Sequence, residues 1–237
     1  MIKLEKHKTW KMKNKSIFVL TIIVISLIAC SSKNDEKYQK RVLPIIGNYD
    51  IEYKTVDGKE VADTVYPKMI DFTFLNQDSL VKTKNELEGK IWIADFFFTT
   101  CPTICPIMTK NMKWLNEQTK DLTNHIQFLS FTINPKRDTP TQLRNYKKHH
   151  QIESTNWDFL TGEENFTHQL GINHFQIFAG EDESAAGGYA HSGAFTLVDK
   201  EGYVRGVYLG TELEQVKQLE KDLRKLIQYE YNGSNSN

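Results

Sequence analysis

Two cysteines four residues apart are the side chains of this 237-residue chain best suited to chemistry. Cys101 and Cys105 lie in the run TTCPTICP, directly after an apolar run over 91–98 and at the start of a segment with helical spacing. The N-terminus of a helix favours anions, so thiolates are expected to be stabilised there. Residues i and i+4 of a helix share one face, so the two sulfurs can close a disulfide or bind one metal ion together.

Three uses of this pair are open. A structural disulfide would close a very small loop, and small loops contribute least to stability in the chain-entropy model. Thiol–disulfide exchange is the second use. Metal binding, with redox chemistry as a companion property, is the interpretation we favour, because two soft thiolates select Cu(I) or Zn(II). Two ligands seldom complete a metal site, so a third ligand is expected elsewhere in the chain.

The chain has seven histidines, and one of them has the best position for that third ligand. His191 lies in the loop GGYAHSG, which leads into an expected strand over 194–198. A loop that enters a central strand can stand beside the helix N-terminus that carries the cysteines. His7 lies in the expected signal segment, and the remaining five histidines are expected to be exposed, capping or packed residues. Spacing alone leaves His191 as a candidate.

The elements that must position these residues follow from hydrophobic periodicity and capping signals. Apolar runs predict buried strands, and apolar residues at helical spacing predict helices. Thr139, Thr161 and Thr211 are each expected to cap a helix. The order predicts an α/β sandwich with a mixed central sheet. The expected elements are hairpins around Asp57-Gly58 and 76–78, strands 91–98, 126–133 and 157–160, helices 105–118, 140–149 and from Thr161 to Leu170, a hairpin over 195–208 and a final helix.

The first thirty residues have the pattern of an export signal. Residues 1–29 hold six lysines and one acid, and they end in an apolar run of 13 residues, 17–29. That run spans about 20 Å as a helix, which is short of a bilayer core. The sequence LIAC resembles a bacterial lipobox, which implies lipidation of Cys30 and a place in the cell envelope. A plain signal peptide and an uncleaved anchor are the alternatives.

Composition excludes several classes of protein. Lys+Arg and Asp+Glu are both 30, so the chain does not bind nucleic acid through bulk positive charge. Three cysteines are too few for a disulfide scaffold.

Three segments together carry a family likeness. The runs FFFTTCPTICP (96–106), NPKRDTP (134–140) and AHSGAFTLVDKEG (190–202) resemble those of the Sco/SenC family of copper chaperones, which have a thioredoxin-like fold. The resemblance implies that Cys101, Cys105 and His191 bind one copper ion, Cu(I) or Cu(II). It further implies a copper-accepting partner, cytochrome c oxidase subunit II, and a thiol reductant.

The chain departs from the family at two positions. Thr103 stands between the cysteines where the family commonly has Asp, and Asn134 opens the second segment where Asp is common. Asp138 is retained. Asp138 either orients the metal ligands through contacts behind them, or accepts hydrogen bonds from a loop or a helix N-terminus. Both interpretations stay open.

The expected organisation is a lipoprotein signal peptide over 1–29, a tether and extended lead-in over 30–66, a thioredoxin-like copper-binding domain over 67–230 with an N-terminal β-hairpin extension, and a polar tail over 231–237. We expect a metallochaperone with possible thiol redox activity rather than a classical enzyme. The strongest rival is a membrane-anchored thiol–disulfide oxidoreductase of thioredoxin type. Thioredoxin-type oxidoreductases usually have a CxxC motif, which this chain lacks, and this function would give His191 no role. A cysteine peroxidase and a metal-free binding module are weaker rivals.

Overall fold

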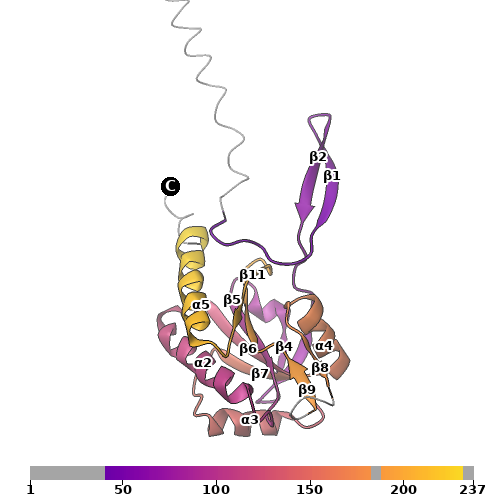
Figure 1. Ribbon diagram of the computed structural model, residues 1–237. Coiled ribbons are helices and arrows are strands. Elements are labelled where there is room, and N and C mark those ends of the chain that lie inside the picture. The colour runs from indigo at the N-terminus through magenta and orange to yellow at the C-terminus, as the bar shows by residue number, and fades with distance from the viewer. Residues whose placement is uncertain (1–40, 183–187, 232–237) are drawn as a thin grey trace, which may run out of the picture. The chain divides into compact units, whose positions relative to one another are not determined.

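A seven-stranded mixed sheet, in the order β11-β10-β5-β6-β7-β3-β4, forms the centre of the computed structural model (Figure 1). Strands β5, β6 and β7 are parallel, and the other neighbours pair antiparallel. The structure describes residues 41–182 and 188–231, with only the backbone of Ala179, Glu181 and His191. The strands of this sheet are β3 Thr73–Asn76, β4 Val81–Thr83, β5 Ile91–Phe97, β6 Ile126–Thr132, β7 Trp157–Thr161, β10 Ala194–Val198 and β11 Val204–Leu209.

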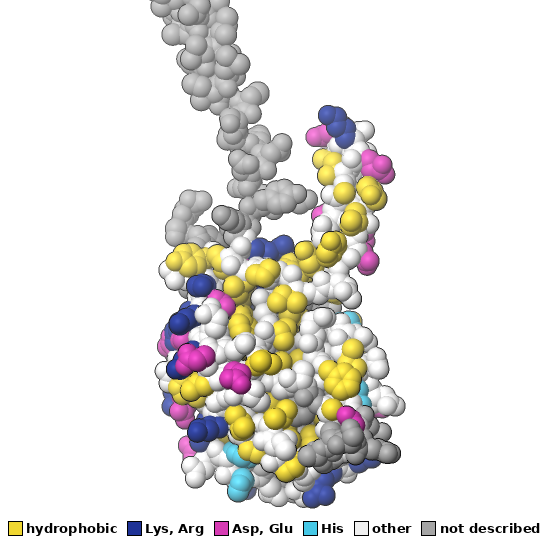
Figure 2. Space-filling model, viewed as in Figure 1, with side chains coloured by type: hydrophobic (Ala, Val, Ile, Leu, Met, Phe, Trp, Pro, Cys, Tyr) yellow, Lys and Arg dark blue, Asp and Glu magenta, His cyan; other side chains and the backbone are white. Residues whose placement is uncertain are grey.

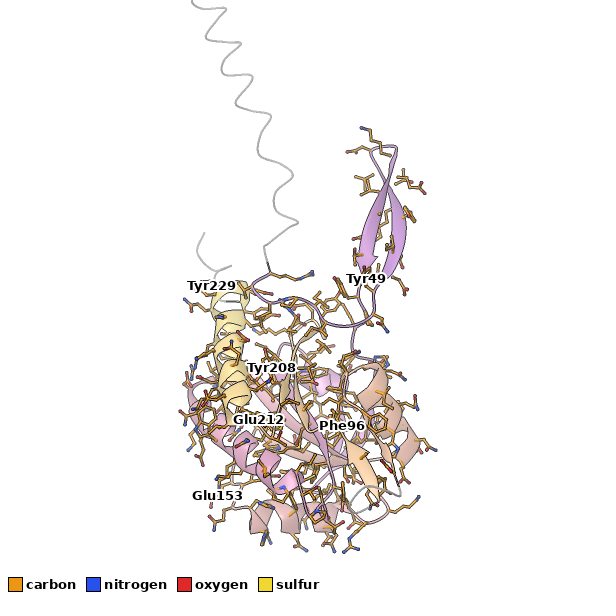
Figure 3. The ribbon with its side chains drawn as sticks, viewed as in Figure 1. Tyr49, Phe96, Glu153, Tyr208, Glu212 and Tyr229 are labelled. Carbon is orange, nitrogen blue, oxygen red and sulfur yellow. The ribbon has the colours of Figure 1, made fainter. Side chains whose placement is uncertain are left out.

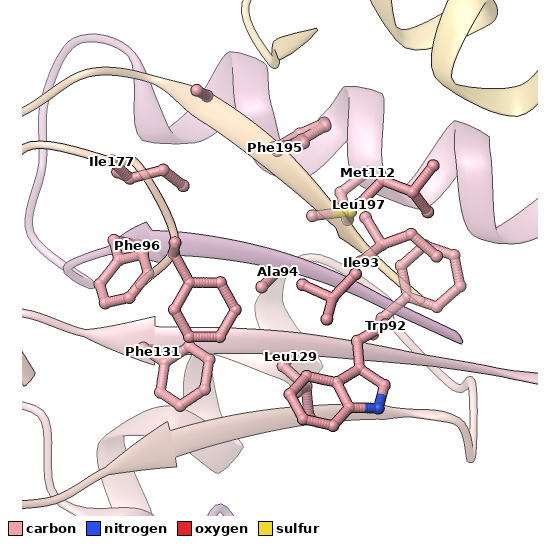
Figure 4. Close-up of a cluster of buried hydrophobic side chains, with 14 of the residues drawn as sticks. Trp92, Ile93, Ala94, Phe96, Met112, Leu129, Phe131, Ile177, Phe195 and Leu197 are labelled. Atoms are coloured by element: carbon pink, nitrogen blue, oxygen red, sulfur yellow. The ribbon is translucent and has the colours of Figure 1, made fainter. Parts of the chain in front are cut away.

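Helices cover both faces of the sheet, as the buried strands require. Every residue of β5 and β6 is buried, which is why both strands are rich in apolar residues on both faces. Phe96 and Phe97 are neighbours on β5, so their side chains point to opposite faces of the sheet. Tyr146, in the helix over 140–149, packs on Phe97 with ring centroids 5.3 Å apart, and Gly171, in the helix over 164–173, approaches Phe96. Figure 4 shows the aromatic and aliphatic core around these strands. The helices are α2 Cys105–Gln118, α3 Pro140–His149, α4 Glu164–Asn173 and α5 Leu213–Leu226, with short helical turns η1 Lys84–Leu87, η2 Lys120–Leu122 and η3 Ile227–Tyr231.

Helix starts agree with the sequence in two cases and differ in two. Helix α2 spans the predicted residues, and Thr139 caps α3 by accepting the backbone N–H of Gln142. The prediction for Thr161 was wrong: it ends β7, and the carboxylate of Glu163 caps α4 instead. The prediction that Thr211 caps α5 was also wrong. The N-cap residue of α5 is Glu212, and its side chain makes no capping hydrogen bond.

The predicted N-terminal hairpin is present. Strands β1 Asp50–Val56 and β2 Lys59–Val65 pair antiparallel, and Asp57 and Gly58 turn the chain with φ of 50° and 76°. Their residues are exposed except for half-buried Val65, and Figure 2 shows hydrophobic side chains among charged ones along this hairpin. A second small sheet was not predicted: β8 Ala179–Glu181 pairs with β9 Tyr189–His191.

Helix α5 is fixed to the sheet through a polar contact. The hydroxyl of Tyr208 on β11 donates to the carboxylate of Asp222 on α5 over 3.1 Å, and both residues are buried (Figure 3 labels Tyr208). The predicted signal peptide, Cys30 and nearly all of the predicted tail lie outside the described residues. Within the part of the chain that the structure describes, no helix has both the length and the apolar composition needed to cross a bilayer.

Candidate metal centre

Cys101 and Cys105 lie in the connection between β5 and α2. Strand β5 ends at Phe97, and Cys105 is the first residue of α2, with Pro106 behind it at a position that suits proline. The backbone of Phe98 holds both cysteines: its carbonyl accepts the N–H of Cys101 over 3.2 Å, and its own N–H hydrogen-bonds the sulfur of Cys105. The two cysteines do not form a disulfide with each other, and both are buried, with 8% of Cys101 and 1% of Cys105 exposed.

The two sulfurs are hydrogen-bonded to each other, and this bond sets their ionisation. The Cys105 thiol donates to Cys101 and lowers the pKa of Cys101, and backbone N–H groups of Cys105 and Thr103 lower it further against the effect of burial. The same bond and burial raise the pKa of Cys105. Of the two sulfurs, that of Cys101 is therefore the more readily ionised.

Thr103, one of the two residues that depart from the family pattern, contacts the sulfur of Cys101. Its hydroxyl oxygen lies 3.6 Å from the sulfur of Cys101, within hydrogen-bond range for sulfur. A hydroxyl can donate to a thiolate, whereas an ionised Asp at the same position can only accept. Thr103 therefore adds a donor beside the more ionised sulfur.

Asp138 supports the cysteine loop through hydrogen bonds to Thr99. It is completely buried, and its carboxylate accepts the backbone N–H of Thr99 over 2.9 Å as well as the hydroxyls of Thr99 and Thr132. Thr99 lies two residues before Cys101, and Thr132 ends β6. The carboxylate thus joins the start of the cysteine loop to the neighbouring strand.

The backbone of His191 ends strand β9, beside the cysteine segment. Two residues later, Gly193 adopts a φ of 66°, and a Cβ placed there would lie 3.3 Å from Cδ1 of Ile104 and 3.9 Å from Sδ of Met108. Two residues earlier, the ring of Tyr189 packs on the ring of Phe98 with centroids 5.5 Å apart. The chain on both sides of His191 therefore contacts the segment that holds the cysteines.

These contacts bring the three predicted ligand positions into one region of the fold. Among the side chains that the structure describes, no three His, Cys, Asp or Glu residues form a cluster able to hold a metal ion. The thiol pair provides two soft donors, and the His191 side chain lies outside the described atoms.

Asp95 is a buried acid near the site that sequence analysis did not single out. Its side chain projects from β5, is 3% exposed, and its Oδ1 has no hydrogen-bond partner among the described atoms. Burial raises the pKa of Asp95 to about 7, against a hydrogen bond from Ser130, and its charge raises the pKa of Cys105. The signal was available, since Asp95 is the one charged residue within the apolar run 91–98.

Comparisons with known proteins identify similar chains. A family model described as SCO1/SenC matches residues 61–228. The SCO1 protein homolog of Bacillus subtilis is 33% identical over 160 residues, which cover 65% of this chain and 80% of the relative. A putative copper-binding protein of Stutzerimonas stutzeri is 31% identical over 125 residues, which cover 51% of this chain and 58% of the relative.

Two solved structures are similar in fold and in sequence. A SCO1/SenC family lipoprotein from Bacillus anthracis superposes with a TM-score of 0.62 at 32% identity, covering 67% of this chain and 94% of the other. BsSco, described with a disulfide switch and as a member of the Sco family of cytochrome c oxidase assembly proteins, gives 0.57 at 31% identity, covering 65% and 92%.

Proposed function

The chain belongs to the SCO1/SenC family, and on that premise we propose that it is a membrane-tethered copper chaperone whose ligands are Cys101, Cys105 and His191. Its fold is the thioredoxin-like fold that the sequence resemblance implied. The proposed acceptor is the copper centre of cytochrome c oxidase, in subunit II, in line with the oxidase-assembly description of its relative BsSco.

The observation that carries the proposal is the hydrogen-bonded thiol pair at the start of α2. The two cysteines are not joined by a disulfide, both are buried, and their hydrogen bond lowers the pKa of Cys101. Soft sulfur donors select Cu(I), and imidazole adds affinity for Cu(II). The donor set therefore fits copper in both oxidation states, provided that His191 joins the sulfurs.

Copper binding must displace a proton from this pair. Metal ligands bind as Cys thiolate and neutral His, so the thiol of Cys105 has to lose its proton as copper enters. The raised pKa of Cys105 makes this proton the harder one to remove. We therefore expect copper affinity to fall as pH falls.

The same sulfurs can be oxidised. Two thiols give a disulfide by losing two electrons and two protons to an acceptor disulfide, which becomes two thiols. The disulfide form cannot bind copper as a dithiolate, so a thiol reductant must act before copper loading. The thiolate character of Cys101 also favours the second candidate function, a membrane-anchored thiol–disulfide oxidoreductase.

Tethering is proposed from the lipobox-like sequence at Cys30. The Bacillus anthracis protein of similar structure is described as a lipoprotein, which supports the same reading for this chain. A lipid on Cys30 would hold the domain at a membrane of the cell envelope, facing the periplasm.

Copper titration of the reduced protein tests the proposal. We expect one equivalent of Cu(I) or Cu(II) to bind, with a sulfur-to-copper charge-transfer band for Cu(II). Loss of a residue that only hydrogen-bonds a metal ligand typically lowers metal affinity about 10–100-fold. Cys101→Ser and Cys105→Ser remove proposed ligands, so each should lower copper affinity by more than that. Cys30→Ser is the matched control and should bind as the wild type does. A reduced protein that binds no copper but rapidly reduces a model disulfide would establish the oxidoreductase instead.

A further inference from the structure

Strand β9, which carries the backbone of His191, has few backbone contacts of its own. It spans three residues and pairs only with the three residues of β8 within the described chain. A two-stranded sheet of this size is marginally stable in water without side-chain packing. Backbone bonds hold the end of β9 at His191: the N–H of Ser192 donates to the carbonyl of Phe178 over 3.0 Å, and the N–H of Gly210 donates to the carbonyl of Gly193 over 2.7 Å. Side-chain contacts at the other end of β9 complete the placement of the His191 backbone.

Tyr189 is the side chain that makes these contacts. Its ring packs on Phe98, with centroids 5.5 Å apart, and lies 6.2 Å from the ring of His168 on α4. Phe98 is the residue whose backbone hydrogen-bonds both cysteines. Tyr189 therefore joins the strand of the proposed imidazole ligand to the loop of the sulfur ligands.

The hydroxyl of Tyr189 has a specific acceptor. It donates to Oε1 of Glu164 over 2.8 Å, and the other carboxylate oxygen of Glu164 pairs with Nζ of Lys136 over 2.7 Å. The Glu164 side chain is 13% exposed, whereas that of Lys136 is 74% exposed. Glu164 is thus a mostly buried acceptor, held at the first turn of α4, and Lys136 is its solvent-facing partner.

We propose that Glu164 is a positioning residue of the metal centre: by accepting the Tyr189 hydroxyl it fixes β9 and so sets how much His191 adds to copper binding. This inference rests on the proposed function. Cu(I) is satisfied by soft sulfur donors, whereas Cu(II) gains from imidazole. Loss of the Tyr189–Glu164 bond therefore weakens Cu(II) binding and leaves Cu(I) binding by the cysteine pair unchanged.

Tyr189→Phe is the sharpest test, because it removes one oxygen and keeps the ring on Phe98 and His168. We expect Cu(II) affinity to fall about tenfold and the nitrogen hyperfine coupling in the Cu(II) EPR spectrum to weaken, with Cu(I) affinity within about twofold of wild type. Tyr229→Phe is the matched control, since Tyr229 is 59% exposed (Figure 3), and it should change none of these.

Substitutions of Glu164 separate the acceptor from the charge. Glu164→Gln keeps an oxygen that can accept from Tyr189 and should bind Cu(II) within about twofold of wild type, because the lost ion pair is with an exposed lysine. Glu164→Ala should match Tyr189→Phe, and the double variant should be no weaker than either single one.

Two results overturn the inference. One is a Tyr189→Phe protein with wild-type Cu(II) affinity and EPR spectrum while His191→Ala lowers that affinity, in which case the copper site stands and the positioning role fails. The other is equal loss of Cu(I) and Cu(II) binding in Tyr189→Phe, which marks a general structural role. If His191→Ala itself leaves Cu(II) binding unchanged, the ligand assignment fails and this inference falls with it.

Discussion

The backbone N–H of Thr99 donates to the buried carboxylate of Asp138 over 2.9 Å, so the second sequence motif holds the first in place. The carboxylate also accepts the hydroxyls of Thr99 and Thr132, and all three of these partners are donors. An ionised Asp accepts at every lone pair, whereas Asn would turn an NH₂ donor toward a donor.

Asp138→Asn should therefore destabilise the protein. We expect the free energy of unfolding to fall by about 2 kcal/mol, the cost of a buried group left without a suitable partner. Urea denaturation measures this value. Asp63→Asn is the control, since Asp63 pairs with Lys54 at the surface and should cost less than about 0.5 kcal/mol. Equal stability of Asp138→Asn and wild type would show that Asp138 does not support the loop.

The unequal pKa values of the two thiols predict selective alkylation. Because the pKa of Cys101 is lowered, its rate of reaction with iodoacetamide should change little between pH 8 and pH 6, whereas an ordinary thiol slows about tenfold per pH unit below its pKa. Cys105 should stay unmodified. Peptide mapping by mass spectrometry gives the rate at each cysteine.

Cys105→Ala provides the matching variant. It removes the thiol that donates to Cys101, so the pKa of Cys101 should rise and its alkylation at pH 6 should slow. A rate at Cys101 that does not depend on Cys105 would contradict the hydrogen-bonded pair.

The raised pKa of Asp95 predicts a pH dependence of stability. The folded protein holds the Asp95 proton up to about pH 7, whereas the unfolded chain loses it near pH 4. The native state thus binds more protons between these values, and stability should fall as pH rises from about 4 to 7, by up to about 1.4 kcal/mol per pH unit from this group. Urea unfolding of the reduced, metal-free protein at pH 5 and pH 7 measures the fall.

Asp95→Asn removes this ionisable group. The difference in unfolding free energy between wild type and Asp95→Asn should therefore shift in favour of the variant as pH rises. An identical pH dependence in the two proteins would mean that Asp95 titrates normally.

Arg205 allows stability to be tested apart from the metal site. Its side chain is 1% exposed, pairs with Asp199 and Glu230, and donates to the carbonyls of Leu43 and Pro44. Arg205→Met leaves two carboxylates without their partner and should cost about 3–5 kcal/mol. Cu(I) affinity of the folded fraction should be unchanged. Calorimetry and copper titration measure the two effects, and a loss of copper affinity would link this network to the site.

Local sequence signals predicted the elements well where the decisive contacts are local. The spacing of Met108, Met112 and Leu115 gave the bounds of α2, and Thr139 and Pro140 gave the start of α3. Thr161 has an equally good capping pattern, but it pairs with Leu75 at the end of β7, so strand pairing overrides the local signal.

The site was predictable in part for the same reason. The cysteine pair is a local pattern: the structure places Cys105 at the first residue of α2 as expected, whereas Cys101 lies in the turn before the helix and not on it. The contacts around His191 depend on Tyr189 meeting Phe98 and Gly193 meeting Ile104, pairs separated by about ninety residues, and strands of three residues leave no periodic signal. Single-sequence periodicity does not report such contacts.

The most direct test of the account is copper K-edge X-ray absorption of the protein loaded with one equivalent of Cu(II). We predict two sulfur neighbours and an imidazole nitrogen at the copper, with the imidazole scattering lost in His191→Ala and a sulfur lost in Cys101→Ser. A spectrum without sulfur neighbours, or one in which His191→Ala changes nothing, would contradict the proposed copper centre.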